Sequence, residues 1–190
     1  MTEVEKLDAG LAYDFWDEGV NERKIRAIEL CAKLESVSVR EEETRAKILR
    51  ELFRAVGEEP SVGPGFLCDW GKNISVGKQF LANYNVTILD IMPVTIGDYV
   101  MIGPGTMIST VNHPLSPAER RKHMGIGRPV RIGNDVWIGG NVSILPGVNI
   151  GNNVVVAAGA VVTHDIPDNC IAAGVPAKVI REINNDIGHE

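Results

Sequence analysis

The sequence predicts a mainly β protein, a parallel β-helix preceded by a helical region. Aliphatic residues recur at every sixth position, and the fourth residue after each is again aliphatic. The series runs through Ile132, Ile138, Ile144, Ile150, Val156 and Val162. Turn-forming pairs stand between its members, as at Asn134-Asp135 and Pro146-Gly147.

This spacing excludes a helix and favours a coil of short strands. Six residues turn an α-helix by about 600°, so residues at that interval form no apolar stripe. In an extended chain, by contrast, positions i and i+4 face the same way. A chain that turns after each hexapeptide with one side always inward must coil. Three segments per turn then give a triangular prism of stacked parallel sheets.

Residues 1–59 are predicted to form a helical N-terminal region, because apolar residues recur there at spacings of three and four, as in residues 48–56. Two capping boxes indicate helix starts. Thr2–Glu5 would begin a short first helix and Ser38–Glu41 the third. Gly57 is expected to end that third helix.

Residues 60–190 are predicted to form the coil, which would end in a short C-terminal helix. Its six-residue spacing is broken twice. Residues 86–96 hold an insertion, and a loop at residues 111–129 begins with Asn112-His113-Pro114. Such an interruption in a regular coil calls for a functional explanation.

Composition limits the classes of partner. A net charge of −6 with 23% charged residues argues against a surface for nucleic acid. No apolar run approaches the roughly 18 residues of a membrane span, and the start does not resemble a signal sequence, so we expect no membrane partner and a cytoplasmic protein. Cys31, Cys68 and Cys170 are expected to be free thiols.

Four stretches together resemble a known family: the repeat [Ile/Val]-Gly-x-x-[Val/Ala]-x, the start KLDAGLAYDFWDEG, the loop NHP and the ending AAGVPAKVIREI. Over nearly its whole length the chain is similar to the hexapeptide-repeat sugar O-acetyltransferases. Within them it most resembles the maltose O-acetyltransferases, with galactoside and Nod-factor acetyltransferases close behind. The resemblance implies a left-handed coil and a homotrimer with active sites between subunits. It also implies transfer of an acetyl group from acetyl-CoA to a sugar such as maltose or glucose.

That chemistry requires a base, because an alcohol is a weak nucleophile while it holds its proton. Histidine, with an unperturbed pKa of about 6.5, can remove the proton during attack and return one to the leaving thiolate. His113 occupies the family's catalytic position, and Asn83 matches the asparagine beside it. Without the resemblance, a single His-Pro in a loop would be interpreted as a surface turn.

The acceptor-binding positions that the resemblance assigns are Asn83, Asp69, Asp90, Asp17 and Tyr13. Amides and carboxylates suit sugar hydroxyls because their oxygens accept hydrogen bonds, although Asn and Asp are also common turn formers. Tyr13 and Trp16 could stack on a sugar or dock the helices on the coil, and we prefer docking for Trp16. Galactoside acetyltransferases carry a second carboxylate where this chain has Ile91, which favours maltose or glucose as acceptor.

The resemblance assigns the donor site to Gly140, Ala158, Thr163, Lys178 and Arg181, and we place Trp137 and His164 beside them. Trp137 could line the groove, although we prefer an inward or packing role for it. At Gly140 the backbone N–H would meet the thioester carbonyl and the developing oxyanion. Small residues would let the pantetheine arm lie against the coil. Lys178 and Arg181, three residues apart on a helical turn, would share a face toward the coenzyme A phosphates, although such cations are otherwise ordinary solubility charges.

No histidine pair has the spacing of a metal site, so we expect no metal. Two alternatives remain open. One is an acetyltransferase for another hydroxyl or amine, on a galactoside, an antibiotic or a nucleotide-sugar. The other is a non-catalytic β-helix scaffold, which His113, Asn83 and the basic pair together disfavour.

Overall fold

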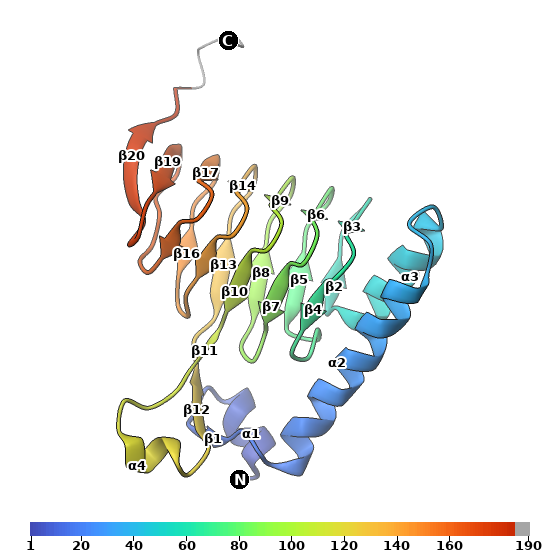
Figure 1. Cartoon of the computed structure of the whole chain (residues 1–190), viewed down its shortest axis with the longest axis vertical. Coiled ribbons are helices and arrows are strands. Elements are labelled where there is room, and N and C mark those ends of the chain that lie inside the picture. The colour runs from blue at the N-terminus through green and yellow to red at the C-terminus, as the bar shows by residue number, and fades with distance from the viewer. Residues whose placement is uncertain (185–190) are drawn as a thin grey trace.

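Three parallel sheets enclose one aliphatic core in the computed structural model, which describes residues 1–184 (Figure 1). Sheet I holds β2 (Ala55–Val56), β5 (Ile74–Val76), β8 (Val94–Ile96), β13 (Val130–Ile132) and β16 (Asn149–Ile150). Sheet II holds β3 (Ser61–Val62), β6 (Leu81–Ala82), β9 (Met101–Ile102), β14 (Trp137–Ile138), β17 (Val154–Val156), β19 (Cys170–Ala173) and β20 (Lys178–Glu182). Sheet III holds β4 (Leu67–Cys68), β7 (Thr87–Leu89), β10 (Met107–Ser109), β15 (Ser143–Ile144) and β18 (Val161–Val162).

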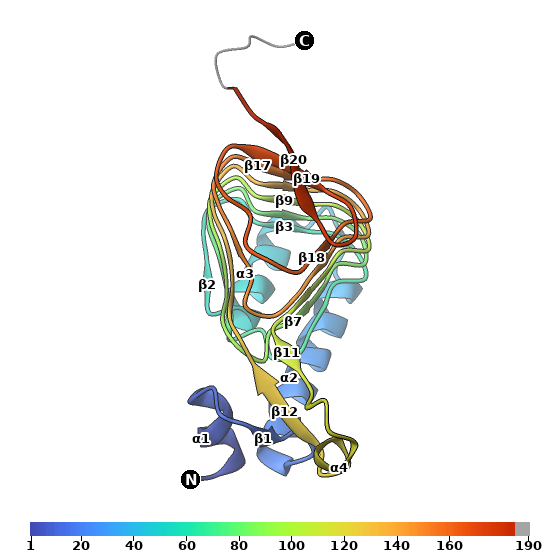
Figure 2. The same cartoon turned by 90° about the vertical axis from the view of Figure 1, so that its left-hand side faces the viewer.

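The chain passes through sheets I, II and III in turn and then returns to sheet I one coil further along. Figure 2 looks along the coil and shows its triangular outline. The predicted parallel β-helix is therefore confirmed. Its three edges are named here by the sheets they join: corner I–II, corner II–III and corner III–I.

The aliphatic series explains the core. Every member from Ile132 to Val162 is buried, and so is the fourth residue after each. Within sheet II, Ile138 pairs with Ile102 on one side and with Val156 on the other. Side chains of one kind thus stack directly over one another, and each buried aliphatic contributes about 1.5–3 kcal/mol to stability.

Asparagine and aspartate side chains join successive coils at corner I–II. Asp98 Oδ1 accepts a hydrogen bond from the Lys78 N–H at 2.9 Å, and Asn134 Oδ1 accepts one from the Asp98 N–H at 2.8 Å. Asn152 Oδ1 continues the ladder by accepting from the Asn134 N–H at 2.9 Å. The turn residues therefore also satisfy backbone donors that point along the coil axis.

Helices close the N-terminal end of the coil. The chain begins with α1 (Glu3–Asp8) and a short strand β1 (Tyr13–Asp14), followed by α2 (Glu18–Ser36) and α3 (Glu42–Leu52). Apolar residues of α2 and α3 share one buried cluster with the first coils. In Figure 2, α3 lies behind the triangle of sheets. The open end of the prism is thus covered by amphipathic helices.

One of the two predicted capping boxes forms. Thr2 and Glu5 cap α1 reciprocally, as expected. The box at Ser38 is wrong: α3 starts at Glu42, and the Ser38 hydroxyl accepts instead from the Arg40 N–H at 3.3 Å. The helix also ends at Leu52 rather than near Gly57, because the chain becomes extended at residue 53 and pairs with β5 as β2.

The predicted C-terminal helix is also wrong. Residues Lys178–Glu182 form β20, which runs antiparallel to β19 at the edge of sheet II. An edge strand offers unpaired backbone groups that a returning chain can satisfy. The β-branched Val179 and Ile180 favour that extended conformation. The last six residues of the predicted coil domain, 185–190, lie outside the described residues.

Candidate active site

His113 lies in the loop that leaves the coil at corner III–I. The loop leaves the coil on β11 (Val111–Asn112), contains α4 (Pro117–Arg120) and returns on β12 (Met124–Gly127), which pairs antiparallel with β11. The other edge of β12 pairs with β1, so the N-terminal region holds the loop in place. Figure 1 shows this small sheet below the prism.

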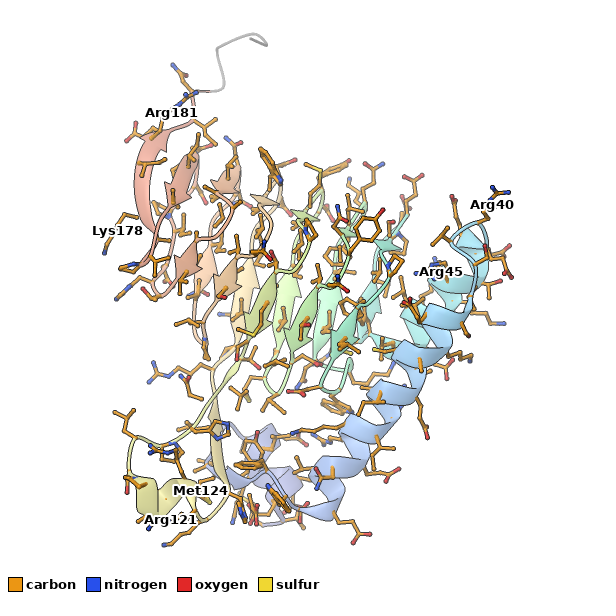
Figure 3. All side chains as sticks on the ribbon, in the orientation of Figure 1. Arg40, Arg45, Arg121, Met124, Lys178 and Arg181 are labelled. Atoms are coloured by element: carbon orange, nitrogen blue, oxygen red, sulfur yellow. The ribbon has the colours of Figure 1, made fainter. Side chains whose placement is uncertain are left out.

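The ring of His113 is oriented by two contacts. Its Nδ1 atom lies 3.1 Å from the carbonyl oxygen of Met124. A carbonyl can only accept, so Nδ1 carries the hydrogen and the neutral ring leaves Nε2 as a free acceptor. Phe15 meets the ring edge-on, with centroids 5.1 Å apart. Met124 stands in the lower part of Figure 3, on the returning arm of the loop.

Phe15 and Met124 are site residues that the sequence did not reveal. Phe15 also meets His123 edge-on, and Trp16 stacks on His123 at 4.9 Å. Trp16 is 66% exposed. The predicted role of Trp16 in docking the helices on the coil is therefore wrong. The only sequence signal for this cluster was the aromatic pair Phe15-Trp16 within the N-terminal motif.

The structure does not support the expected role of Asp90 as an acceptor-binding residue. Its side chain is fully buried, and its two oxygens accept from the backbone N–H groups of Asp69, Trp70 and Asn73 at 2.9–3.2 Å. Burial raises the pKa of Asp90 to about 6, although those hydrogen bonds act in the opposite direction. The carboxylate holds together the turn that carries Asp69, and no oxygen reaches solvent.

Asp69 is half-buried beside the loop sheet at corner III–I. Desolvation raises its pKa, and the charge of Lys24 partly opposes that shift. The neighbouring Tyr13 is 1% exposed and packs with Leu7, Val20 and Ile91. Burial, and then the negative charge of Asp69, raise the pKa of the Tyr13 hydroxyl. Because the ring is buried, the structure favours docking over the alternative of stacking on a sugar, and it does not support Tyr13 as an acceptor contact.

Asp17 is the N-cap of α2. Its Oδ1 accepts from the Val20 N–H at 3.2 Å, which satisfies one of the helix's unpaired donors. The side chain is only partly buried. A contact between Asp17 and an acceptor therefore stays a prediction.

Asn83, Trp137, Gly140 and Ala158 gather at corner II–III. They line one groove with a volume of about 490 Å³. The Asn83 Oδ1 accepts from the Tyr84 N–H at 2.7 Å, which leaves the amide Nδ2 as a donor toward a ligand. Trp137 is 54% exposed on the outer face of sheet II, so it lines the groove and is not a core residue.

The remaining donor positions lie elsewhere. Thr163 and His164 follow β18 at corner III–I, where the Thr163 Oγ1 and His164 Nδ1 atoms are 2.8 Å apart. Lys178 and Arg181 are exposed on β20. They do not share a helical face, and in Figure 3 they extend from opposite ends of that strand.

The candidate site residues of one chain therefore form two separate groups, called half-sites here. His113 and Asp69 lie at corner III–I, whereas Asn83 and Gly140 lie at corner II–III, on the other side of sheet III. Within residues 1–184 there is no group of three His, Cys, Asp or Glu side chains that could hold a metal ion. In the same residues, no helix combines the length and apolarity needed to span a bilayer.

Comparison with known proteins matches both parts of the chain. The family described as "Maltose acetyltransferase hexapeptide capping motif" matches residues 6–57, and that described as "Bacterial transferase hexapeptide (six repeats)" matches residues 129–164. Galactoside O-acetyltransferase of Escherichia coli K12 is 42% identical over 189 residues, covering all of this chain and 93% of that protein.

Two solved structures resemble the whole fold. A maltose O-acetyltransferase from Clostridium difficile 630 superposes with a TM-score of 0.94 at 43% identity, covering 97% of this chain and 99% of the other. A galactoside acetyltransferase in complex with coenzyme A gives 0.92 at 42% identity, covering 97% and 92%. The chain therefore belongs to the hexapeptide-repeat acetyltransferases, the acyltransferase family that includes the galactoside and maltose O-acetyltransferases.

Proposed function

We propose that this protein transfers the acetyl group of acetyl-CoA to a hydroxyl of a sugar such as maltose or glucose, with His113 as general base. The observation that carries the proposal is the hydrogen bond from His113 Nδ1 to the Met124 carbonyl, which leaves Nε2 free to accept a proton. The ring is exposed, on a loop outside the coil. It therefore fills no space in the core and is available to a substrate.

The reaction needs no acyl-enzyme. The sugar oxygen attacks the thioester carbonyl carbon while its proton passes to His113 Nε2, and the C–S bond then breaks. The Gly140 N–H stabilises the negative oxygen that forms in between. The imidazolium returns the proton to the thiolate, which leaves coenzyme A and an acetylated sugar.

We propose that the working unit is a homotrimer, because the two half-sites lie on different corners of one chain. In a closed ring of identical subunits, corner III–I of one subunit can face corner II–III of the next. His113 and Asp69 would then meet Asn83 and Gly140 across an interface. Thr163 and His164 would face Ala158 in the same way, along the pantetheine arm.

Two finer features complete the proposal. Ile91 is buried among Leu7, Tyr13 and Val20, and it offers a sugar no hydrogen bond, which favours maltose and glucose over a galactoside. Free thiols favour a cytoplasmic location, and Cys31 and Cys68 are free thiols whose sulfurs share a hydrogen bond at 3.9 Å.

Thiol release from acetyl-CoA tests the proposal directly. Glucose, maltose, a thiogalactoside, an amino sugar, serine and chloramphenicol serve as acceptors, and the acetylated product is identified by mass. We expect release to depend on glucose or maltose and to give an ester. The proposal would be contradicted if only an amine acceptor caused thiol release, or if none of the hydroxyl acceptors in the panel did.

A further inference from the structure

Thr106 is a polar residue inside an aliphatic stack. The inward-facing positions at corner II–III are Phe66, Val86, Thr106, Val142 and Ala160. Thr106 is fully buried and is the one member with a polar side chain. A buried hydroxyl costs free energy unless it is hydrogen-bonded, so its presence here calls for a specific role.

The Thr106 hydroxyl is fully engaged with the next coil. Its Oγ1 donates to the carbonyl oxygen of Gly139 at 2.8 Å and accepts from the Val142 N–H at 3.2 Å. These two contacts bracket Gly140 on both sides. The turn that carries Gly140 is thus fixed from inside the prism.

Together with peptide geometry, this contact determines the direction of the Gly140 N–H. In a trans peptide the C=O of one residue and the N–H of the next point in opposite directions. Because the Gly139 carbonyl points inward to Thr106, the Gly140 N–H points outward, to the side of the groove that Gly140 lines. That N–H finds no acceptor among residues 1–184.

The neighbouring turns lack this arrangement. One coil earlier, the position equivalent to Gly140 is Pro104, which has no N–H. Two coils earlier it is Tyr84, whose N–H is occupied by the Asn83 side chain. One coil later, the equivalent Ala158 also has an N–H without an acceptor among residues 1–184, but Val142 stands behind it. Among these turns, only that of Gly140 combines an unpaired N–H with a hydroxyl that holds its peptide from inside.

We propose that Thr106 is a positioning residue, which aims the Gly140 N–H at the thioester carbonyl of bound acetyl-CoA. The inference rests on the proposed role of Gly140 in acetyl transfer. Thr106 touches no substrate itself. It acts by preventing the Gly139–Gly140 peptide from turning its N–H away from the groove.

Two variants separate the hydroxyl from the packing. Thr106→Val keeps the methyl group and removes the hydroxyl, and Thr106→Ser does the reverse. Loss of one oxyanion donor typically lowers kcat about 10²–10³-fold, so a donor that is present but misdirected should lower it at least about tenfold. We expect that loss in Thr106→Val, with little change in the KM for acetyl-CoA, and near wild-type kcat in Thr106→Ser.

If Thr106 served only to pack the core, Thr106→Val should keep a higher kcat than Thr106→Ser, since valine already fills the equivalent positions at Val86 and Val142. Equal kcat in wild type and Thr106→Val would overturn the proposal, as would a larger loss in Thr106→Ser. If Thr106→Val did not fold, Thr106→Ala compared with Thr106→Ser would make the same test, because both lack the methyl group and only serine keeps the hydroxyl.

A spectroscopic measurement makes the result independent of the acceptor. Acetyl-CoA with carbon-13 at the acetyl carbonyl is bound without sugar, and the infrared stretch of that carbonyl is compared with its value in solution. A directed N–H lowers the frequency. We expect the lowering in wild type and Thr106→Ser and less of it in Thr106→Val. An unchanged shift in Thr106→Val would overturn the inference even if sugar acetylation were confirmed, and a lost shift would support it even if the acceptor were not a sugar.

Discussion

The Nδ1 atom of His113 lies 3.1 Å from the carbonyl oxygen of Met124, eleven residues further along the loop. This contact fixes the tautomer of an exposed ring whose other neighbour, Phe15, comes from the N-terminal region. A histidine held in one orientation, whose neutral form presents Nε2 as the acceptor, is prepared for proton transfer. Both arms of the loop and β1 contribute to that orientation.

His113→Ala should abolish most of the transfer while leaving the fold intact. Removal of a general base typically lowers the rate about 10²–10⁴-fold, and the loss should appear in kcat because the proton moves in the transition state. Steady-state kinetics with acetyl-CoA and maltose measure it, and coenzyme A binding should be unchanged.

His123→Ala is the matched control. His123 is also exposed on the loop and contacts the same Phe15, but its ring makes no hydrogen bond to the Met124 carbonyl. Its kcat should stay within a few-fold of wild type. A His113→Ala variant that folds, binds coenzyme A and keeps more than about a tenth of wild-type kcat would show that this loop does not carry the base.

Lys178→Ala and Arg181→Ala should each raise the KM for acetyl-CoA and leave kcat less affected. Both cations are exposed on β20, where attraction to phosphate is screened by salt. The rise in KM should therefore be larger at low ionic strength than at high ionic strength. Arg40→Ala is the control, because Arg40 is an exposed cation at the opposite end of the coil (Figure 3). An equal rise in KM for Arg40→Ala would show that Lys178 and Arg181 act only as part of the general surface charge.

Asp90 should make stability depend on pH. Burial raises its pKa in the folded protein to about 6, above the value of 3.8 for a free side chain. The folded state thus holds the proton more tightly than the unfolded state. The stabilisation from that proton is fully present below about pH 4, is lost as the pH rises through 6, and amounts to about 3 kcal/mol.

Denaturant unfolding of wild type and Asp90→Asn at pH 4.5 and pH 7 measures this effect. Carboxylates remote from Asp90 titrate alike in both proteins, so their contribution cancels in the difference. Only Asp69, whose negative charge acts on Asp90, is directly coupled to the substitution. Wild type should gain stability relative to Asp90→Asn as the pH is lowered. A difference between the two proteins that did not change with pH, or that favoured wild type more at pH 7, would contradict the assignment.

The coil could be predicted from the sequence because its core obeys a local rule. Ile138 stacks on Ile102 and Val156 as a direct result of a repeat that closes one turn of the prism. The local sequence of β20 does not distinguish a strand from a helix, because Lys178 and Arg181 suit a helical turn as well as a strand. What decides between them is the open edge of β19, which a short segment does not reveal.

The site was only partly predictable for the same reason. His113 and Asn83 were found through family motifs, whereas Phe15 reaches His113 from the N-terminal region and Met124 from the other arm of the loop. Asp90 looks like any polar residue in sequence. Only the turn at residues 69–73 shows that backbone N–H groups occupy both of its oxygens.

Maltose and glucose should have a higher kcat/KM than a thiogalactoside. Ile91 presents no hydrogen bond at the position where galactoside acetyltransferases carry a carboxylate, and one hydrogen bond to a charged group contributes about 1.5–3 kcal/mol. Thiol release at limiting acceptor concentration gives the three values. A thiogalactoside that surpassed both glucose and maltose would show the specificity to be wrong.

Subunits with different defects should restore each other's activity. Asn83→Ala and His113→Ala homotrimers should both be impaired. In mixed trimers, a subunit with Asn83→Ala still supplies His113, and a neighbour with His113→Ala still supplies Asn83. If each site combines these residues across an interface, a one-to-one random mixture should form intact sites at about a quarter of all positions, and each purified mixed trimer should hold one intact site, about a third of its positions. Co-expression with two different tags, followed by purification on both and light scattering, isolates the mixed trimers. If both residues served a site within one chain, no mixture could contain an intact site, and activity no greater than that of the two single variants would exclude a shared site.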